Sequence, residues 1–324
     1  MVARTTAAGK ALQAYCPTSM PLEGLHHVTA ICADAQRNVD FYARVLGLRL
    51  VKKTVNFDQP DVYHLYYGDE AGTPGSILTF FEFPGAGRGV AGAGMVHAIV
   101  WRAGGPEALA FWAARLTDEG TAVTWDRGGL LRFADPEGLV HEIVPSDAGD
   151  PPLTAVRLDI PPEHRLLGFH GVRAYSHAPE RSAPLLTALG FEQRAAGGAW
   201  VAQGARRHGV IHYDAPPSGR GIPGAGTVHH VAWSAADDAE LTALRGAVQA
   251  AGGRPTPIVD RQYFHSVYFR EPSGVLFELA SRDIGFAVDE DPAELGAHLK
   301  LPPQHESRRG QLEALLTPLP NPRY

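Results

Sequence analysis

Two short segments, far apart in the chain, each place a pair of histidines at the start of an apolar run. They are residues 24–28, with the sequence GLHHV, and residues 227–231, with the sequence TVHHV. Further along, Glu278 stands in the apolar stretch LFEL. Two histidines and one carboxylate carried on strands form a ligand set that holds Fe(II) and leaves coordination positions open. One histidine of each pair, together with Glu278, is therefore a candidate metal site.

The chain contains internal repeats, which decide its architecture. Residues 92–101 (GAGMVHAIVW) match residues 224–233 (GAGTVHHVAW), and FADPEGLVHE at 133–142 matches FREPSGVLFE at 269–278. A second pair of repeats begins with LHHVTA and FHGVRA, each leading to a Leu-Gly turn. In chain order, these repeats define four modules over residues of about 22–84, 94–146, 166–214 and 226–281.

Each module is expected to contain a strand, a helix and three further strands. In module 1, His27, Thr29 and Ile31 alternate as on a strand, Asp34 can cap a helix, and Gly47 can end it. The fold class is therefore α+β, with four βαβββ modules arranged as two domains of paired modules. A stretch rich in Pro and Asp at 147–162 is the natural linker. The predicted domains are residues 1–150 (modules 1 and 2) and 163–324 (modules 3 and 4 with a tail).

The composition describes a globular chain with a mild acidic excess. Its 324 residues are 44% hydrophobic and 20% charged, and the net charge is -6. Such a charge disfavours nucleic acid or an anionic membrane as a partner. No stretch reaches the ~18 apolar residues of a membrane span, and residues 1–17 show no apolar signal segment. Cys16 and Cys32 cannot form a disulfide framework, so a cytoplasmic location is expected.

The fourfold βαβββ pattern resembles the vicinal oxygen chelate superfamily, which includes glyoxalases and extradiol dioxygenases, over residues 22–281. In that superfamily the modules work in pairs, and the implied metal ligands lie on the first and last strands. The first strands carry His27, Ala98, Gly171 and His230 in modules 1 to 4. The last strands carry Thr79 in module 1, Glu142 in module 2 and Glu278 in module 4, with residues 211–213 the nearest match in module 3.

The resemblance thus implies one metal site per chain, built from the two ends of the sequence. Modules 1 and 4 together supply His27, His230 and Glu278, whereas modules 2 and 3 keep only Glu142. Thr79 is a poor ligand at the fourth position, where a glyoxalase-type site needs Glu, Gln or His. Three protein ligands would leave coordination positions open.

Several longer sequence segments resemble those of the bacterial hydroquinone-type ring-cleaving dioxygenases of this superfamily. They are residues 24–29 (GLHHVT), 62–69 (VYHLYYGD), 75–84 (GSILTFFEFP), 288–291 (VDED) and 299–304 (LKLPPQ). The resemblance implies an extradiol-type enzyme that uses Fe(II), with Mn(II) as a second option, O2 and a small aromatic diol. It also implies roles near the metal for Thr29, His229, Arg261 and Tyr268. A homodimer is compatible with the sequence.

The turn sequence EPSG at 271–274 places one aromatic residue beside the carboxylate. A type I turn with a left-handed glycine pairs residue 268 with residue 278, so Tyr268 should face Glu278 and could donate a proton. Arg261 could hold an anionic oxygen of the substrate. Tyr268, His229 and Arg261 are therefore the candidate catalytic residues. The candidate pocket residues are Thr29, Thr79, His26 and His64.

The first histidine of each pair is harder to place. Neighbouring residues on a strand point to opposite faces, so His26 and His229 should face away from the metal unless a bulge re-aims them. His97 and His170 occupy the same place in the modules that lack the ligands. This persistence indicates a structural role shared by all four modules, with His229 the better pocket candidate of the pair.

Simpler interpretations stay open. Tyr268 could be a core aromatic residue and Arg261 a surface arginine. On the same fold, the chain could instead be a glyoxalase-type lyase or isomerase that uses Zn or Ni. It could also be a metal-free protein that binds and sequesters small molecules, although such proteins lack the ligand set.

Overall fold

The computed structural model describes residues 22–146, 148–194, 198–319 and 321. The expectation about a signal segment in residues 1–17 lies outside these residues, and so does Cys16. Within the described part of the chain, every helix is too short or too polar to cross a membrane.

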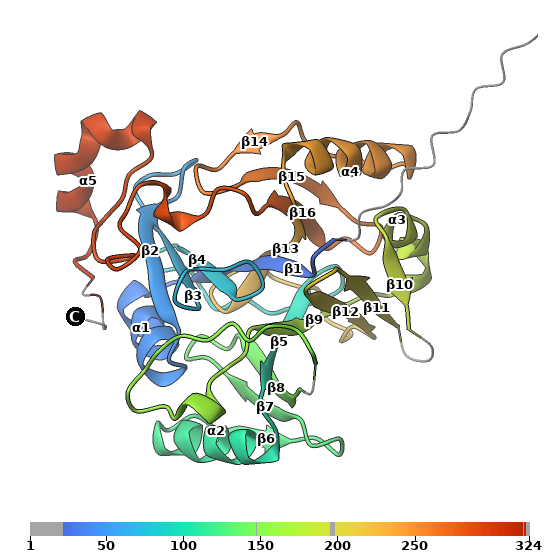
Figure 1. Cartoon of the computed structure of the whole chain (residues 1–324), viewed down its shortest axis with the longest axis horizontal. Coiled ribbons are helices and arrows are strands. Elements are labelled where there is room, and N and C mark those ends of the chain that lie inside the picture. The colour runs from blue at the N-terminus through green and yellow to red at the C-terminus, as the bar shows by residue number, and fades with distance from the viewer. Residues whose placement is uncertain (1–21, 147, 195–197, 320, 322–324) are drawn as a thin grey trace, which may run out of the picture.

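Two eight-stranded sheets form the body of the molecule (Figure 1). The strands of the first sheet are β1 (Leu25–Cys32), β2 (Arg49–Val55), β3 (Tyr63–Gly68), β4 (Ile77–Glu82), β13 (Thr227–Ala235), β14 (Val259–Asp260), β15 (His265–Arg270) and β16 (Leu276–Ser281). The strands of the second sheet are β5 (Val96–Ala103), β6 (Val123–Trp125), β7 (Leu131–Ala134), β8 (Val140–Pro145), β9 (Phe169–Tyr175), β10 (Phe191–Gln193), β11 (Ala199–Gln203) and β12 (His208–Asp214).

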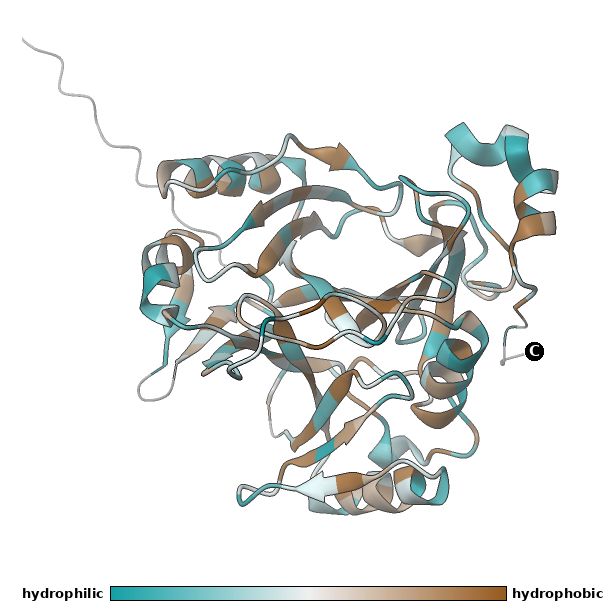
Figure 2. Ribbon diagram, turned by 180° about the vertical axis from the view of Figure 1, so that it is seen from behind, coloured by the Kyte–Doolittle hydropathy of each residue, from teal (hydrophilic) through white to brown (hydrophobic). Residues whose placement is uncertain are grey.

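Helices pack against the sheets, except for the last one, which lies at the side of the molecule with the C-terminal tail (Figure 1). They are α1 (Ala35–Val39), continued by a π-helical turn over Asp40–Val45, α2 (Pro106–Asp118), α3 (Ala183–Ala188), α4 (Asp238–Ala250) and α5 (Arg309–Leu315). Short 3-10 turns cover Pro162–His164, Pro179–Ser182, Phe286–Val288 and Pro303–Arg308. In α4 the buried side chains Leu241, Leu244 and Val248 recur at helical spacing. Hydrophobic residues are concentrated in the strands and on the inner faces of the helices (Figure 2).

The order of the strands confirms the predicted α+β fold of four βαβββ modules. The first sheet runs β14-β15-β16-β13-β1-β4-β3-β2 and joins module 4 to module 1, whereas the second runs β10-β11-β12-β9-β5-β8-β7-β6 and joins module 3 to module 2. The joins are the antiparallel pairs β1–β13 and β5–β9. Each sheet therefore combines one module from each predicted domain, 1–150 and 163–324, and the metal-ligand positions of modules 1 and 4 share a sheet.

The histidines that recur at one position in all four modules lie at irregularities in these two joins; they are His26, His97, His170 and His229. In the β1–β13 pair, Leu25 faces Trp233 and His27 faces Ala232, so His26 has no partner. His229 is skipped in the same way on β13. The β5–β9 pair skips His97 and His170. The role shared by the four modules is therefore a β-bulge, which bends the strand and re-aims its side chains.

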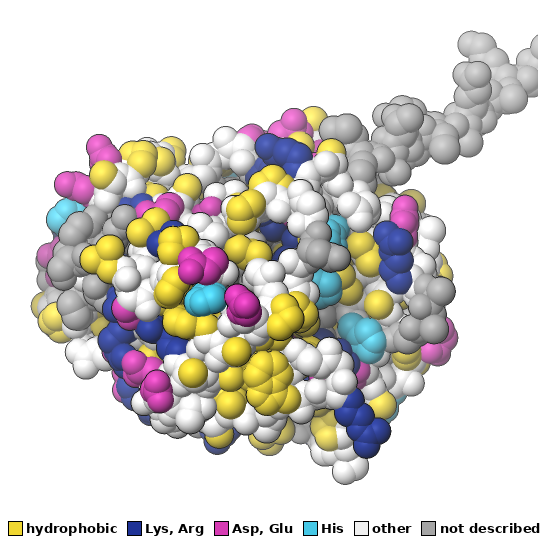
Figure 3. Space-filling view, turned by 60° about the horizontal axis from the view of Figure 1, so that its bottom comes forward, with side chains coloured by type: hydrophobic (Ala, Val, Ile, Leu, Met, Phe, Trp, Pro, Cys, Tyr) yellow, Lys and Arg dark blue, Asp and Glu magenta, His cyan; other side chains and the backbone are white. Residues whose placement is uncertain are grey.

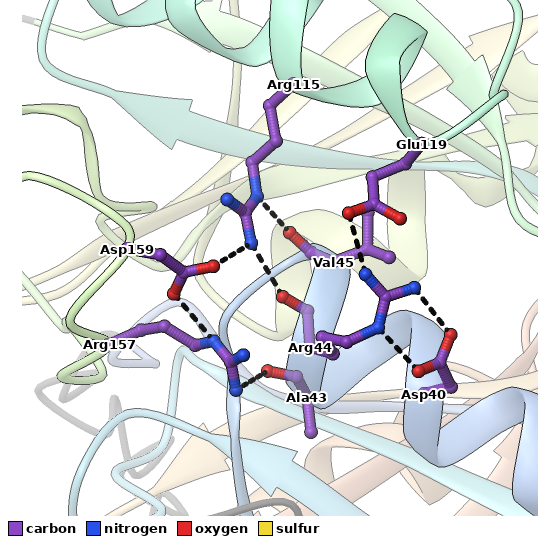
Figure 4. A network of polar contacts seen from close by, with 8 residues as sticks. All are labelled: Asp40, Ala43, Arg44, Val45, Arg115, Glu119, Arg157 and Asp159. Carbon is purple, nitrogen blue, oxygen red and sulfur yellow. Dashed lines mark hydrogen bonds and ion pairs between the residues drawn. The ribbon is translucent and has the colours of Figure 1, made fainter.

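The linker between the two halves is fixed to the helices by a polar network (Figure 4). Arg115 of α2 donates to the Val45 carbonyl and, at 2.8 Å, to Asp159 of the linker. Asp159 also accepts from Arg157 at 2.8 Å, and Arg44 joins Asp40 to Glu119. Basic and acidic side chains lie next to each other elsewhere on the surface too, as in the view of Figure 3.

The C-terminal tail packs back on module 1. Leu299 forms a parallel bridge with Lys53 of β2. Lys52 has no exposed side-chain area, and its ammonium lies 2.7 Å from the carboxylates of both Asp289 and Glu290. A buried ion pair of this kind fixes the geometry of the tail, because removing either partner leaves an uncompensated charge.

Gly171 occupies, in module 3, the position that His230 holds in module 4. A Cβ atom at Gly171 would lie 2.1 Å from the Val210 carbonyl oxygen, so the backbone would have to move. We expect Gly171→Ala to reduce the free energy of unfolding by about 1–3 kcal/mol through overpacking, measured by urea denaturation. Gly246→Ala is the matched control, because Gly246 lies in α4 with open space around it. For Gly246→Ala we expect the free energy of unfolding to rise by up to about 1 kcal/mol. Equal effects of the two substitutions would contradict the steric argument.

Candidate metal centre and its cavity

His27, His230 and Glu278 converge in the middle of the first sheet, on the adjacent strands β1, β13 and β16. The Nε2 atoms of the two histidines are 3.2 Å apart. Glu278 Oε2 lies 3.2 Å from His27 Nε2 and 2.9 Å from His230 Nε2. All three side chains are buried, and one ligand atom from each lies within 4.8 Å of the others. These residues could hold a divalent cation.

The surroundings of Glu278 fit a bound cation. Its Oε1 accepts a hydrogen bond from Ser266, but its Oε2 has no hydrogen-bond partner, although the side chain has no exposed area. Burial opposes ionisation, but the facing imidazoles of His27 and His230 hold the pKa of Glu278 well below its usual range. A buried carboxylate oxygen without a donor needs a compensating charge, and a divalent cation between these three groups would supply it.

His26 fixes the tautomer of its neighbour. Its Nε2 lies 3.0 Å from the Ser281 carbonyl, which only accepts hydrogen bonds, so Nε2 carries the proton. Burial, and then the charge of His27, lower the pKa of His26 to about 3, so its Nδ1 keeps a lone pair at neutral pH. That Nδ1 lies 3.0 Å from His27 Nδ1, which must therefore donate. A histidine ligand is a neutral imidazole, so when His27 binds a metal its Nδ1 carries the proton and its Nε2 presents a lone pair to the metal position.

His229 bears the same relation to His230, whose Nδ1 lies 2.8 Å away. If His230 Nε2 is a ligand, its Nδ1–H donates to His229 Nδ1, and His229 then carries its own proton on Nε2. His229 lines the cavity described below, so it would present an N–H donor there. The bulges thus bring neighbouring histidines into contact, which is the exception to regular strand alternation that the sequence left open.

A cavity of about 470 Å³ opens beside the three residues. Its apolar wall is formed by Phe57, Phe81, Phe83, Phe264 and Leu276. Its polar groups include Thr29, Asn56, Asp58, Gln59, His64, Tyr66, His229, Thr256, Arg261 and Tyr268. This volume and this mixture suit a small aromatic ligand with polar substituents. A hollow of about 620 Å³ beside α1 and the linker is larger but contains no cluster of metal ligands, so the chemistry points to the smaller cavity.

The predicted hairpin register is confirmed. Tyr268 faces Glu278, Phe269 faces Phe277, and Gly274 adopts a φ of 103°, the left-handed conformation expected after the turn. Burial, and then the charge of Glu278, raise the pKa of Tyr268, so its phenol keeps its proton at neutral pH. The Arg261 guanidinium donates to the Tyr268 hydroxyl at 3.2 Å and lies 3.3 Å from Asp58.

The structure separates the remaining candidates. Thr29 and His64 line the cavity, but His26 and Thr79 are not among its lining residues. Thr79 is fully buried and hydrogen-bonded to both His64 and Thr29, so its hydroxyl does not point at the metal position. The sequence did not reveal Ser266, although it lies on the same face of β15 as Tyr268. It also did not reveal Phe264, whose ring centroid is 5.0 Å from those of both His26 and His27.

The second sheet has a buried carboxylate at the position equivalent to Glu278, but an arginine side chain faces it. Glu142 of β8 is fully buried and faces Arg132 across the β7–β8 pair, as Glu278 faces Tyr268. The Arg132 guanidinium donates to Glu142 Oε1 at 3.0 Å, whereas Glu142 Oε2, like Glu278 Oε2, has no hydrogen-bond partner. The register places His212 at the last-strand position of module 3, paired with Arg173. A half-exposed guanidinium thus compensates the buried carboxylate here, and the described residues contain one metal-ligand cluster, in the first sheet.

Buried neutral histidines should make the metal-free protein sensitive to acid. Burial lowers the pKa of His26 and of His141 to about 3, below the value of about 6.5 in an unfolded chain. As the pH falls below 6.5 the unfolded chain therefore takes up protons first, and each histidine reduces the free energy of unfolding by about 2 kcal/mol at pH 5. Urea denaturation at pH 7 and pH 5 measures this change, and an unchanged midpoint would contradict it.

The metal ligands can be tested by direct binding. We expect Glu278→Gln and His230→Ala each to weaken Fe(II) or Mn(II) binding by about 100-fold or more, because a three-residue site loses one ligand. Anaerobic calorimetry measures the affinity. Glu142→Gln is the matched control, since Glu142 is equally buried but paired with Arg132. If this control weakened binding as much as Glu278→Gln, the assignment of the site would be wrong.

Comparisons with known proteins identify the family of this chain. The model of the Glyoxalase/Bleomycin resistance protein/Dioxygenase superfamily matches residues 24–143 and 164–279. The chain is 43% identical to the "Putative ring-cleaving dioxygenase MhqO" of Bacillus subtilis, covering 91% of this chain and 96% of that protein.

Two further relatives extend the comparison. The chain is 35% identical to the chlorohydroquinone/hydroquinone 1,2-dioxygenase of Sphingobium indicum, covering 90% of this chain and 95% of that protein. The crystal structure of a putative dioxygenase from Bacillus subtilis superposes on this chain with a TM-score of 0.86 at 41% identity, covering 92% of this chain and 98% of that one. Since the family model spans more than half of the chain, this protein belongs to the Glyoxalase/Bleomycin resistance protein/Dioxygenase superfamily.

Proposed function

We propose that the protein is an Fe(II)-dependent dioxygenase that opens the ring of a hydroquinone- or catechol-like diol with O2. The observation that carries this proposal is the convergence of His27, His230 and Glu278 beside an aromatic-walled cavity of about 470 Å³. The names of the relatives, which include ring-cleaving and hydroquinone dioxygenases, support the same reaction class. Both atoms of O2 would enter the product, so no further reductant is required.

Two neutral imidazoles and one carboxylate would hold the metal. Because only three residues would hold it, a bound Fe(II) would have coordination positions left for O2 and for an ionised hydroxyl of the substrate, and would supply the redox chemistry that couples the two. Mn(II) prefers similar ligands and is the second option. Thr79, whose hydroxyl is committed to His64 and Thr29, gives no fourth ligand, which disfavours a glyoxalase-type site.

Side chains of this chain would bind and orient the diol. The rings of Phe81 and Phe264 confine a flat substrate, and the Arg261 guanidinium can hold an anionic oxygen. Tyr268 keeps its proton and stands across from Glu278, so it can donate to an oxygen that gains charge as the ring opens. His229 offers a second N–H donor in the same cavity.

Oxygen consumption tests the reaction. After anaerobic reconstitution with Fe(II), we expect the protein to consume one O2 per molecule of hydroquinone or catechol, with a ring-opened product identified by mass spectrometry. His230→Ala should reduce the rate by at least about 1,000-fold because the metal position is lost. A fully metal-loaded protein that consumed no O2 with any diol would refute the proposal.

Arg261 should act mainly on substrate binding. Replacing its planar guanidinium with an ammonium removes the paired donors, so we expect Arg261→Lys to raise KM by about 10-fold while kcat changes less. Arg44→Lys, in an exposed ion pair with Asp40, is the matched control and should leave both constants unchanged. Steady-state oxygen uptake gives both values, and an unchanged KM in Arg261→Lys would exclude this role.

A further inference from the structure

A chain of hydrogen bonds crosses the module 1 side of the cavity, opposite Arg261 and Tyr268. The Tyr66 hydroxyl lies 2.9 Å from His64 Nδ1, and His64 Nε2 lies 2.9 Å from Thr79 Oγ1. Thr79 Oγ1 then donates to Thr29 Oγ1 at 2.9 Å. The neighbouring strands β1, β4 and β3 hold these groups in register, because Thr29 pairs with Thr79 and Thr79 pairs with Tyr66.

The last bond gives the chain a direction, because its heavy-atom geometry has Thr79 as donor and Thr29 as acceptor. A hydroxyl has one hydrogen, so Thr79, which donates to Thr29, must accept from His64. His64 therefore carries its proton on Nε2. Burial, and then the charge of His27, lower the pKa of His64 well below its usual value, so the ring is neutral and its Nδ1 accepts from Tyr66.

This order leaves the hydroxyl hydrogen of Thr29, at the end of the chain of hydrogen bonds, without an acceptor among the described residues. Thr29 Oγ1 accepts from Thr79, and no described residue accepts from the Thr29 hydroxyl. Thr29 lines the cavity, two residues after the candidate ligand His27. Its hydroxyl hydrogen can therefore be donated only into the cavity or to solvent within it. Thr79 and Thr29 are almost fully buried, at 0% and 1% exposed, so water does not compete for the internal bonds.

We propose that Tyr66, His64 and Thr79 form a one-directional relay of hydrogen bonds that holds the Thr29 hydroxyl as a donor to an oxygen of the bound diol. His64 and Thr79 are then positioning residues that act through Thr29. The role in substrate binding rests on the proposed dioxygenase function, whereas the proton order is a property of the protein alone. This oxygen of the diol would accept hydrogen bonds from two sides, from Thr29 on module 1 and from Arg261 on module 4.

The proton order can be tested without metal or substrate. Nitrogen-15 NMR of histidine-labelled, metal-free protein distinguishes the two neutral tautomers, and the signals that disappear in His64→Gln belong to His64. We expect the tautomer protonated on Nε2 at pH 7, and the same result in the control Tyr63→Phe, because the Tyr63 hydroxyl donates to the distant Thr317 carbonyl. Protonation on Nδ1, or a charged ring, would overturn the relay.

Kinetics then test the link to the substrate. We expect Thr29→Val, which removes the donor, to raise KM by about 10- to 100-fold, as for a lost hydrogen bond to a charged oxygen. Thr79→Val should raise KM by about 3- to 10-fold through loss of orientation, and Thr79→Ser should restore it. Fe(II) affinity should stay within twofold throughout.

The two kinds of failure are distinguishable. Unchanged KM values in Thr29→Val and Thr79→Val, with an active wild type, would refute the positioning role. An inactive but metal-loaded wild type with the expected His64 tautomer would refute the dioxygenase function and leave the proton order standing. A Thr79→Val protein that failed to fold would leave Thr29→Val and the tautomer measurement to decide.

Discussion

The structure is organised around one buried carboxylate, Glu278, whose negative charge has to be compensated. Glu278 has no exposed area and lacks a hydrogen-bond donor for one oxygen. Leaving such a charge uncompensated in a protein interior costs several kcal/mol or more. Two imidazoles on neighbouring strands face it, and each is oriented by the histidine that precedes it. The bulges of β1 and β13 make this possible, because in regular strands the adjacent rings would point to opposite faces.

Much of the fold could be predicted from the sequence, because the information is local. The modules repeat, Asp34 does cap α1, and the turn at 271–274 fixes which residue faces Glu278. The joins between modules could not be predicted in this way, since the bulges at His26 and His229 arise from pairing between strands from opposite ends of the chain. The position of Thr79 was predictable, but its hydrogen bonds to His64 and Thr29 depend on three strands together.

The second sheet shows how the same frame is stabilised without a metal. Glu142 keeps its buried position, and Arg132 replaces the cation across the hairpin. Gly171 leaves no room for a side chain where module 4 carries His230. The two sheets therefore share bulges, register and a buried carboxylate, but they differ in the positive charge that compensates this carboxylate. In the second sheet it is the Arg132 guanidinium, and in the first sheet it would be a cation at the candidate metal position.

The pairing of β1 with β13 also has a consequence for biosynthesis. His27 and His230 meet in space but are separated by 203 positions in the sequence. On a ribosome, the first histidine emerges long before the second, and module 1 lacks its partner strand until module 4 is made. Closing so long a loop is entropically slow compared with local contacts. A chain that lacks module 4 therefore cannot assemble the three-residue cluster, so a metal ion could be bound by all three residues only after module 4 has been made.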